Sequence, residues 1–324
     1  MLWLAGLMGM MMLGSIAVIS TQEGEEDRDE DVEGGDAVSD DPLPEEAASG
    51  VAGDADAPGG LVLDGSDGAE TLTGTPMTDL LGGAGGDDLV QGLGADDELL
   101  GGAGADTVLG GDGNDTLHGD DGDDLLSGGA GDDALFAHAG ADTLLGDDGD
   151  DVLNGGSGGE FLDGGDGDDA LHGREGDDTL FGGTGSDTLM GGAGDDVLSG
   201  IEDGVTDYLN AGDGADSLLV GAGDVATGGA GADDFLMSLS SSSGGEAATL
   251  MDFDAVEDQV VVVYDDRSGA VPEVELRDSP TEPGMMELLV DGEVLAVMPG
   301  AEAPDPGDIV LIGESVAGEM IAGG

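Results

Sequence analysis

Aspartate recurs at every ninth residue through the middle of the chain. Between residues 82 and 199 the sequence reads as thirteen tandem nonapeptides of the pattern G-G-x-G-x-D-x-U-x, where U is a large apolar residue. We place their starts at residues 82, 91, 101, 110, 119, 128, 137, 146, 155, 164, 173, 182 and 191, with one extra residue near Glu98. Position six then carries a carboxylate in every copy: Asp87, Asp96, Asp106, Asp115, Asp124, Asp133, Asp142, Asp151, Glu160, Asp169, Asp178, Asp187 and Asp196.

These carboxylates predict a cation site. Stacked one β-strand apart, at about 4.8 Å, ionised side chains would repel one another. A hard cation between them reverses that effect, and calcium prefers six to eight oxygen ligands in flexible geometry. Magnesium fits less well because it demands octahedral geometry and keeps its waters. Soft metals are disfavoured, since the chain has no Cys and only three His.

The other positions of the nonapeptide predict the elements that hold these carboxylates. Glycines at positions one, two and four suit a turn with positive φ. Positions seven to nine suit a short strand whose alternate side chains face opposite ways, with seven and nine in solvent. Two nonapeptides would form one coil, so that equivalent positions stack every eighteen residues. Position eight points inward and is apolar: Leu89, Val108, Leu117, Leu126, Leu135, Leu144, Leu153, Leu162, Leu171, Leu180, Leu189 and Leu198.

Apolar burial alone does not hold such a coil. One buried leucine per repeat contributes roughly 1.5–3 kcal/mol. Ordering nine residues costs about 1–2 kcal/mol each, and glycine lies at the costly end. Bound cations are therefore expected to supply the missing stabilisation.

The repeats resemble the calcium-binding nonapeptides of the RTX (repeats-in-toxin, hemolysin-type) family. The resemblance implies an all-β fold, a parallel β-roll (β-solenoid), with calcium between the turns of repeats n and n+2. It makes the position-six aspartates metal ligands, together with Asp216 and Asp233 of two later, imperfect copies. Glu160 and the Ala137-His138 start depart from the pattern. The alternative, a low-complexity chain without a fold, does not explain a large apolar residue at every ninth place.

Composition limits the partners. There are 76 acidic residues against four Arg and no Lys, and the net charge is −72. This charge excludes nucleic acid as a natural partner and argues against anionic membranes. With no Cys, disulfides cannot stabilise the chain, and aromatic residues are only 2%.

Changes in composition predict four segments. Residues 1–20 are a hydrophobic segment, either an uncleaved membrane anchor or a secretory signal with a cleavage site near Ser15-Ile16-Ala17. Residues 21–60 form an acidic disordered linker, and residues 61–236 form the roll. Residues 237–324 form a small β-rich cap with a strand at 260–264, a hairpin at 287–295 that turns at Asp291-Gly292, and a strand at 309–312.

No enzyme motif is found. His118, His138 and His172 lack the H-E-x-x-H pattern of metalloproteases, and His118 and His172 would lie about 14 Å apart, too far to share a metal. Gly155-x-Ser157-x-Gly159 matches the nucleophile motif of hydrolases but lies inside a repeat. Calcium ligation accounts for the carboxylate pairs before glycosidase chemistry is needed. EF-hands are disfavoured because no helical periodicity flanks the Asp-rich loops.

These observations favour calcium-induced folding of a secreted or surface-displayed structural or adhesive module. Two alternatives stay open. One is an accessory, secretion-assisting module of an extracellular enzyme system, and the other is an ice- or mineral-binding solenoid. An ice- or mineral-binding solenoid would need one residue type repeated along a face, whereas position three varies among Ala, Asp, Ser, Glu and Thr.

Overall fold

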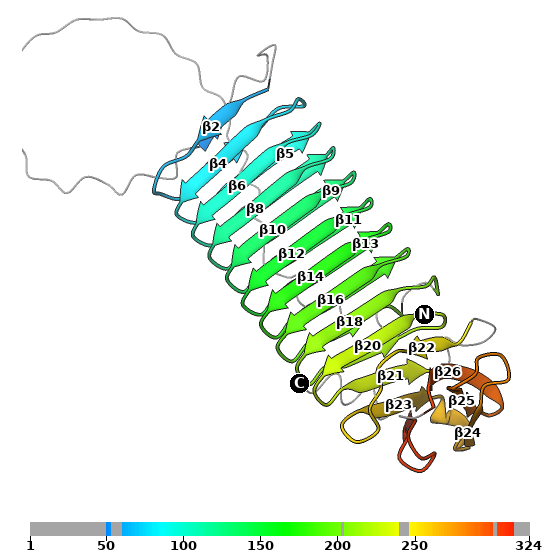
Figure 1. Ribbon diagram of the computed structural model, residues 1–324. Coiled ribbons are helices and arrows are strands. Elements are labelled where there is room, and N and C mark those ends of the chain that lie inside the picture. The colour runs from blue at the N-terminus through cyan, green and yellow to red at the C-terminus, as the bar shows by residue number, and fades with distance from the viewer. Residues whose placement is uncertain (1–49, 53–59, 202–203, 240–245, 301–302, 314–324) are drawn as a thin grey trace, which may run out of the picture. The chain divides into compact units, whose positions relative to one another are not determined.

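Two long β-sheets form almost the whole structure. The computed structural model describes residues 50–52, 60–201, 204–239, 246–300 and 303–313. In these ranges the chain forms a 13-stranded and a 14-stranded sheet, no α-helix, and one short 3-10 helix, η3 (Asp266–Ser268). Odd-numbered strands up to β23 belong to the first sheet and even-numbered strands up to β22 to the second, so the chain alternates between the sheets (Figure 1). The expected all-β parallel solenoid is confirmed.

The strands have the following bounds. The 13-stranded sheet contains, in spatial order, β1 (Gly50–Ala52), β3 (Thr71–Thr73), β5 (Leu89–Gly94), β7 (Thr107–Asp112), β9 (Leu125–Ala130), β11 (Thr143–Asp148), β13 (Phe161–Asp166), β15 (Thr179–Thr184), β17 (Val197–Ser199), β19 (Ser217–Val220), β21 (Asp234–Ser238), β23 (Gln259–Tyr264) and β27 (Val310–Gly313). The 14-stranded sheet contains β2 (Val62–Asp64), β4 (Leu80–Gly85), β6 (Glu98–Ala103), β8 (Thr116–Asp121), β10 (Ala134–Ala139), β12 (Val152–Ser157), β14 (Ala170–Glu175), β16 (Thr188–Ala193), β18 (Tyr208–Asp213), β20 (Val225–Ala230), β22 (Ala248–Leu250), β26 (Glu293–Pro299), β25 (Met285–Val290) and β24 (Val274–Asp278).

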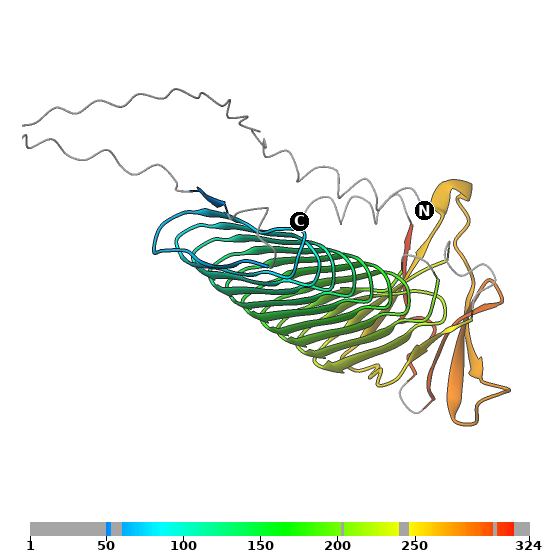
Figure 2. The ribbon, with the colours of Figure 1, turned by 90° about the horizontal axis from the view of Figure 1, so that it is seen from above.

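The strand register confirms that two nonapeptides make one coil. Each strand from β1 to β21 pairs in parallel with the strand two further along the chain. In the regular repeats the partners are eighteen residues apart, as in Thr116↔Ala134 and Leu117↔Leu135 of β8 and β10. Figure 2 shows the coils as flattened loops stacked one behind the next. Most strands continue through positions one to three of the next repeat, so they are longer than the expected three residues.

One apolar side chain per repeat fills the space between the sheets. The position-eight residues from Val108 to Leu198 are fully buried, as expected. Leu89 is an exception, because it is only half-buried while its neighbour Val90 is fully buried. Both sheets place one side of every strand against this narrow core, since alternate side chains face opposite ways.

The predicted phase of the first two repeats is wrong by one residue. Leu89 pairs with Thr107 and Val90 with Val108, so Val90 occupies position eight. The copies therefore begin at residues 83 and 92, and the register needs no extra residue near Glu98. Counting back by nine places further copies at residues 65 and 74, which extends the regular roll toward the N-terminus.

The roll tolerates a short insertion after Ser199. Val197 pairs with Ser217 and Thr188 with Tyr208, a spacing of 20 residues in place of eighteen. The next coil shortens to 17 residues, as in Tyr208↔Val225 and Ser217↔Asp234. The turns absorb these differences, so the strands keep their alignment.

Both sheets continue past residue 236, where we expected the cap to begin. β21 runs across this boundary, and β23 and β27 extend the same parallel sheet. β22 is followed in its sheet by β26, β25 and β24, the last three pairing antiparallel. The predicted hairpin is confirmed, since Val290 pairs with Glu293 and Asp291 and Gly292 both have positive φ.

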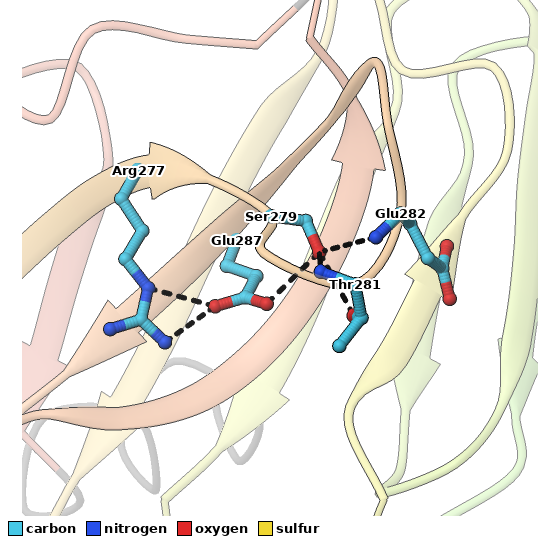
Figure 3. Close-up of polar contacts among 5 residues, drawn as sticks. All are labelled: Arg277, Ser279, Thr281, Glu282 and Glu287. Atoms are coloured by element: carbon cyan, nitrogen blue, oxygen red, sulfur yellow. Dashed lines mark hydrogen bonds and ion pairs between the residues drawn. The ribbon is translucent and has the colours of Figure 1, made fainter.

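A partly buried ion pair joins β24 to β25 (Figure 3). Arg277 donates from Nε and a terminal nitrogen to Oε2 of Glu287, at 2.9 and 2.6 Å. Ser279 Oγ donates to the other carboxylate oxygen at 3.1 Å. Glu287 is 6% exposed, so these donors satisfy a charge that would otherwise be costly to bury.

The predicted N-terminal hydrophobic segment, residues 1–20, lies outside the described residues. So does the predicted linker 21–60, apart from residue 60 and β1, which pairs with β3. Within the ranges that the structure covers, no helix has the length and apolar character needed to cross a membrane.

Candidate metal centre

Two columns of buried carboxylates run along the roll. Each carboxylate directly precedes a strand, because position six ends the turn that leads into positions seven to nine. The column that precedes strands of the 13-stranded sheet, here the first column, contains Asp88, Asp106, Asp124, Asp142, Glu160, Asp178, Asp196, Asp216 and Asp233. The second column precedes strands of the 14-stranded sheet and contains Asp79, Asp97, Asp115, Asp133, Asp151, Asp169, Asp187, Asp207 and Asp224.

Hydrogen bonds aim every aspartate in the same direction. The backbone N–H of Asp106 donates to Oδ1 of Asp124, one coil further on, at 2.8 Å. Asp124 donates in turn to Asp142, also at 2.8 Å. The same bond repeats in the second column, for example from Asp97 to Asp115. The backbone therefore fixes one oxygen of each carboxylate along the stack.

The second oxygen of most of these carboxylates is buried without a hydrogen-bond partner. The Oδ2 atoms concerned belong to Asp88, Asp97, Asp106, Asp115, Asp124, Asp133, Asp142, Asp151, Asp169, Asp196, Asp216 and Asp233. A buried, unsatisfied, charged oxygen is strongly destabilising. Its regular repetition in one direction indicates positions where a cation belongs.

The position-one glycines leave space beside these oxygens. A methyl group built on Gly110 would collide with Oδ2 of Asp115 and with the backbone carbonyl oxygen of Gly128. The same two kinds of oxygen, one from a carboxylate and one from the next coil, border Gly83 and Gly146. In these copies glycine leaves the carbonyl and the carboxylate facing the same space, whereas Ala137 and Ala211 occupy position one before Asp142 and Asp216.

Burial makes the carboxylates hard to ionise when no cation is bound. It is the largest cause that raises the pKa of Asp97, Asp124, Asp151 and Asp233 to about 6. It likewise raises the pKa of Asp133, Asp169 and Asp196 to about 7. The backbone N–H bonds oppose this shift, while neighbouring carboxylates of the same column add to it. A bound cation would remove this disadvantage by favouring the ionised form.

The donor atoms fit calcium. Among the described residues no three side chains of His, Cys, Asp or Glu gather into a metal-binding group. Any ion between two coils must therefore combine aspartate oxygens with backbone carbonyls. Calcium accepts this mixture, whereas zinc prefers Cys and His in a tetrahedron. Two consecutive aspartates of one column and the carbonyls of their glycine turns are the residues that would hold it.

Most of the predicted ligands are buried in the structure. All twelve aspartates predicted from Asp106 onward lie in the two columns: Asp106, Asp115, Asp124, Asp133, Asp142, Asp151, Asp169, Asp178, Asp187, Asp196, Asp216 and Asp233. Their contact with calcium stays a prediction.

The positions of Asp87 and Asp96 are corrected. Both are exposed at position five, and the buried residues are their neighbours Asp88 and Asp97. Oδ1 of Asp87 accepts the N–H of Ala105 at 3.0 Å, and Oδ1 of Asp96 accepts the N–H of Asn114 at 3.0 Å. Position five thus forms its own exposed row of carboxylates that bond the turn of the next coil.

Sequence reasoning also missed three further members of the columns. Asp79 was overlooked because Pro76 and Met77 obscure its repeat. Asp207 and Asp224 lie in the irregular coils after Ser199, and their Oδ1 atoms accept the N–H groups of Asp187 and Asp207 at 2.8 and 3.1 Å. An aspartate followed two residues later by an apolar residue was the available signal for all three.

Glu160 interrupts the first column, as its departure from the pattern suggested. Its longer side chain does not accept the N–H of Asp142, the bond that an aspartate makes elsewhere. Burial and the neighbouring Asp178 carboxylate raise the pKa of Glu160 to about 9. An ion at this coil would meet a different set of oxygens.

Ser157 has no catalytic surroundings. It lies in β12, not at a strand-to-helix turn, and its Oγ donates only a long 3.5 Å bond to the carbonyl of His138. The G-x-S-x-G match therefore lies within a strand of the roll, which supports its interpretation as accidental.

The histidines are not all isolated. His118 and His172 are three strands apart in the 14-stranded sheet, as expected. His118 and His138, however, lie 3.2 Å apart between Nδ1 and Nε2. The repeat pattern alone does not predict this contact, because the two histidines are 20 residues apart and occupy different repeat positions.

Comparison with known families agrees with this geometry. A family model described as an RTX calcium-binding nonapeptide repeat, in four copies, matches eight overlapping or adjacent stretches: 82–117, 109–144, 118–153, 127–162, 136–171, 154–189, 172–200 and 206–224. No curated protein sequence matches the chain as a whole.

Proposed function

Since residues 82–224 consist of RTX calcium-binding nonapeptide repeats, we propose that calcium folds this roll into an extracellular or surface-displayed structural module. The observation that carries the proposal is the pair of buried carboxylate columns, in which most aspartates have an Oδ2 atom without a hydrogen-bond partner. The module acts as a rigid spacer or adhesive element and not as a catalyst.

Ion binding supplies the free energy that the chain lacks. A chain with net charge −72 opposes its own compaction. Each site filled at a thousandfold above its dissociation constant adds about 4.1 kcal/mol to the folded state. Several such sites outweigh the cost of ordering the glycine-rich turns. The chain would remain expanded where calcium is scarce and would fold where calcium is abundant, as it is outside cells.

The location follows from the same coupling. Secretion in an unfolded, calcium-free state and folding on arrival would suit a chain whose fold depends on external calcium. An acidic surface also resists non-specific association with anionic membranes. Cleavage of the native protein by an external protease on intact cells, before and after chelation, tests this location.

The decisive experiment is a far-ultraviolet circular dichroism titration of the full chain, first freed of metals with a chelator. We expect a coil-to-β transition with calcium and little change at equal concentrations of magnesium. A β signal that is already complete in chelator at neutral pH would refute calcium-coupled folding. An equal response to both ions would refute the assignment to calcium.

A further inference from the structure

Two histidines meet on the outer face of the 14-stranded sheet. His118 lies in β8 and His138 in β10, which are neighbours in the sheet (Figure 1). Their Nδ1 and Nε2 atoms are 3.2 Å apart. The ring of Phe136 stacks on His118, with centroids 5.1 Å apart and an interplanar angle of 14°. The aromatic contact holds one imidazole against the sheet, beside the other.

The backbone beside this pair is conformationally unusual. His138 and its register partner Asp120 have φ values of 80° and 76°. The same repeat position is a positive-φ glycine in Gly102, Gly156 and Gly192 of this sheet. Ala84 and Arg174 have the same positive φ at this position of the sheet, so the conformation belongs to the turn of the repeat. It places the His138 side chain over the preceding coil, beside His118.

The spacing of the two nitrogens suits one metal ion. With metal–nitrogen bonds of about 2.0–2.1 Å, two ligands of a tetrahedral ion lie about 3.3 Å apart. Oδ1 of Asp120 lies 3.8 Å from Nε2 of His138, which adds negative charge beside the pair. We propose that His118 Nδ1 and His138 Nε2 bind one divalent transition-metal ion, of the class of Zn²⁺, Ni²⁺ or Cu²⁺.

This site is chemically distinct from the calcium columns. Imidazole nitrogens suit borderline metals, whereas calcium takes oxygens. The side chain of His138 is 50% exposed, so an ion reaches it from solvent without opening the roll. The site has two protein ligands, and water completes the coordination. The two rings lie nearly parallel, at 16°, with centroids 5.5 Å apart, so their nitrogens face each other and both rings must rotate before the nitrogens converge on one ion. The terminal torsions of the rings are soft enough for this rotation.

The surroundings of His118 favour its neutral form. Burial, aided by the neighbouring His138, lowers the pKa of His118. The neutral imidazole, which carries a free lone pair, is thereby favoured near pH 7. The surrounding acidic surface raises the local concentration of divalent cations.

The test uses the full chain saturated with calcium, so that the carboxylate columns are occupied before nickel is added. Isothermal titration with Ni²⁺ is expected to show one site on the wild type, weakened at least tenfold in H118Q and in H138Q. The matched control is H172Q, which removes the histidine at the same repeat position of β14 and leaves the affinity unchanged. D120N is expected to weaken binding a few-fold. Circular dichroism in calcium confirms that each variant is folded.

A spectroscopic measurement identifies the ligands. The electron paramagnetic resonance spectrum of one equivalent of Cu²⁺ should show coupling to two nitrogens in the wild type and in H172Q, but to one in H118Q. Equal Ni²⁺ affinity in the H118Q/H138Q double variant and in H172Q would overturn the proposal. So would the absence of Ni²⁺ binding to the wild type, which would leave only an imidazole–imidazole hydrogen bond. Neither result would affect calcium-induced folding.

Discussion

Replacing Asp124 with asparagine separates the charge of a position-six carboxylate from its hydrogen bond. Asp124 is 3% exposed, and its Oδ1 accepts the N–H of Asp106 at 2.8 Å. Asparagine keeps an oxygen for this bond and nearly the same volume, but it removes the negative charge. The carbonyl oxygen of Ala137 borders the same space above Gly119, where the new amide group would lie.

The expected loss follows from the place of Asp124 in the first column. It stands between Asp106 and Asp142, so it contributes to the ion sites on both sides. Losing one carboxylate is expected to weaken each site about tenfold, or about 1.4 kcal/mol, and about 3 kcal/mol for the two. For a unit of this size that corresponds to a fall in melting temperature of about 6–12 °C in calcium.

The matched control is Asp123→Asn, one residue earlier. Asp123 is exposed at position five and accepts the N–H of Ala141 at 2.9 Å. Its replacement should change stability by about 0.5 kcal/mol or less. The assay is thermal unfolding at fixed calcium, with the calcium midpoint of folding measured by circular dichroism. Equal shifts in the two variants would refute the ligand assignment. If Asp124→Asn lost the same stability in calcium and in chelator, the carboxylate would not act through calcium binding.

Three further outcomes are expected. Leu117→Ala should lower the free energy of unfolding, measured with urea at saturating calcium, by about 2–5 kcal/mol, because Leu117 is fully buried. The control Thr116→Ala should cost much less, because Thr116 is only half-buried. Equal losses would contradict the inward position of Leu117. Gly110→Ala should weaken calcium binding and lower the free energy of unfolding by about 1–3 kcal/mol, because the added methyl collides with Asp115 and Gly128. The control Gly307→Ala should leave the calcium titration unchanged, because nothing lies within 4 Å of its added methyl. In chelator, acidification should favour the fold. Burial raises the pKa of Asp151 to about 6 and that of Asp133 to about 7, above the ordinary aspartate value of 3.8, so the folded state binds more protons. Stability is therefore lost as the pH rises through about 6 to 7. A β signal in chelator that does not increase between about pH 7.5 and 5 would contradict this predicted pH dependence. In calcium, the same acidification should raise the calcium concentration at the midpoint of folding, because protons compete for the carboxylates.

The sequence predicted the coil because one period controls turn, strand and core together. A large apolar residue at every ninth place and an acidic residue two places earlier leave few alternatives once an eighteen-residue coil is assumed. The phase failed only where the pattern is degenerate. Asp87-Asp88 and Leu89-Val90 satisfy the motif in either of two registers one residue apart. The pairing of Val90 with Val108 decides between them, and pairing is not visible in the local sequence.

The surface contacts could not be predicted for a different reason. They join position nine of one repeat to position two of the repeat three copies later. The pairs His118–His138, Ser127–Asp147 and Asn154–Arg174 all follow this rule, at a separation of 20 residues. The rule depends on the positive φ at position two, which tilts its side chain over the preceding coil. The repeat pattern assigns glycine to position two, so it predicts no side chain there and none of these contacts.

The hydrogen bonds within the columns explain how a glycine-rich, acidic chain can have a single fold. Each Oδ1 bond, such as that from Asp97 to Asp115, ties a coil to the next and holds the carboxylate at one orientation. The same bond directs Oδ2 into a space kept open by glycine, where it has no partner. The arrangement that best aligns the coils is therefore also the one that concentrates unpaired negative charge. Under the proposed function, stability depends on an ion whose binding requires the aligned coils, and we expect this mutual dependence to make folding and calcium binding one cooperative step.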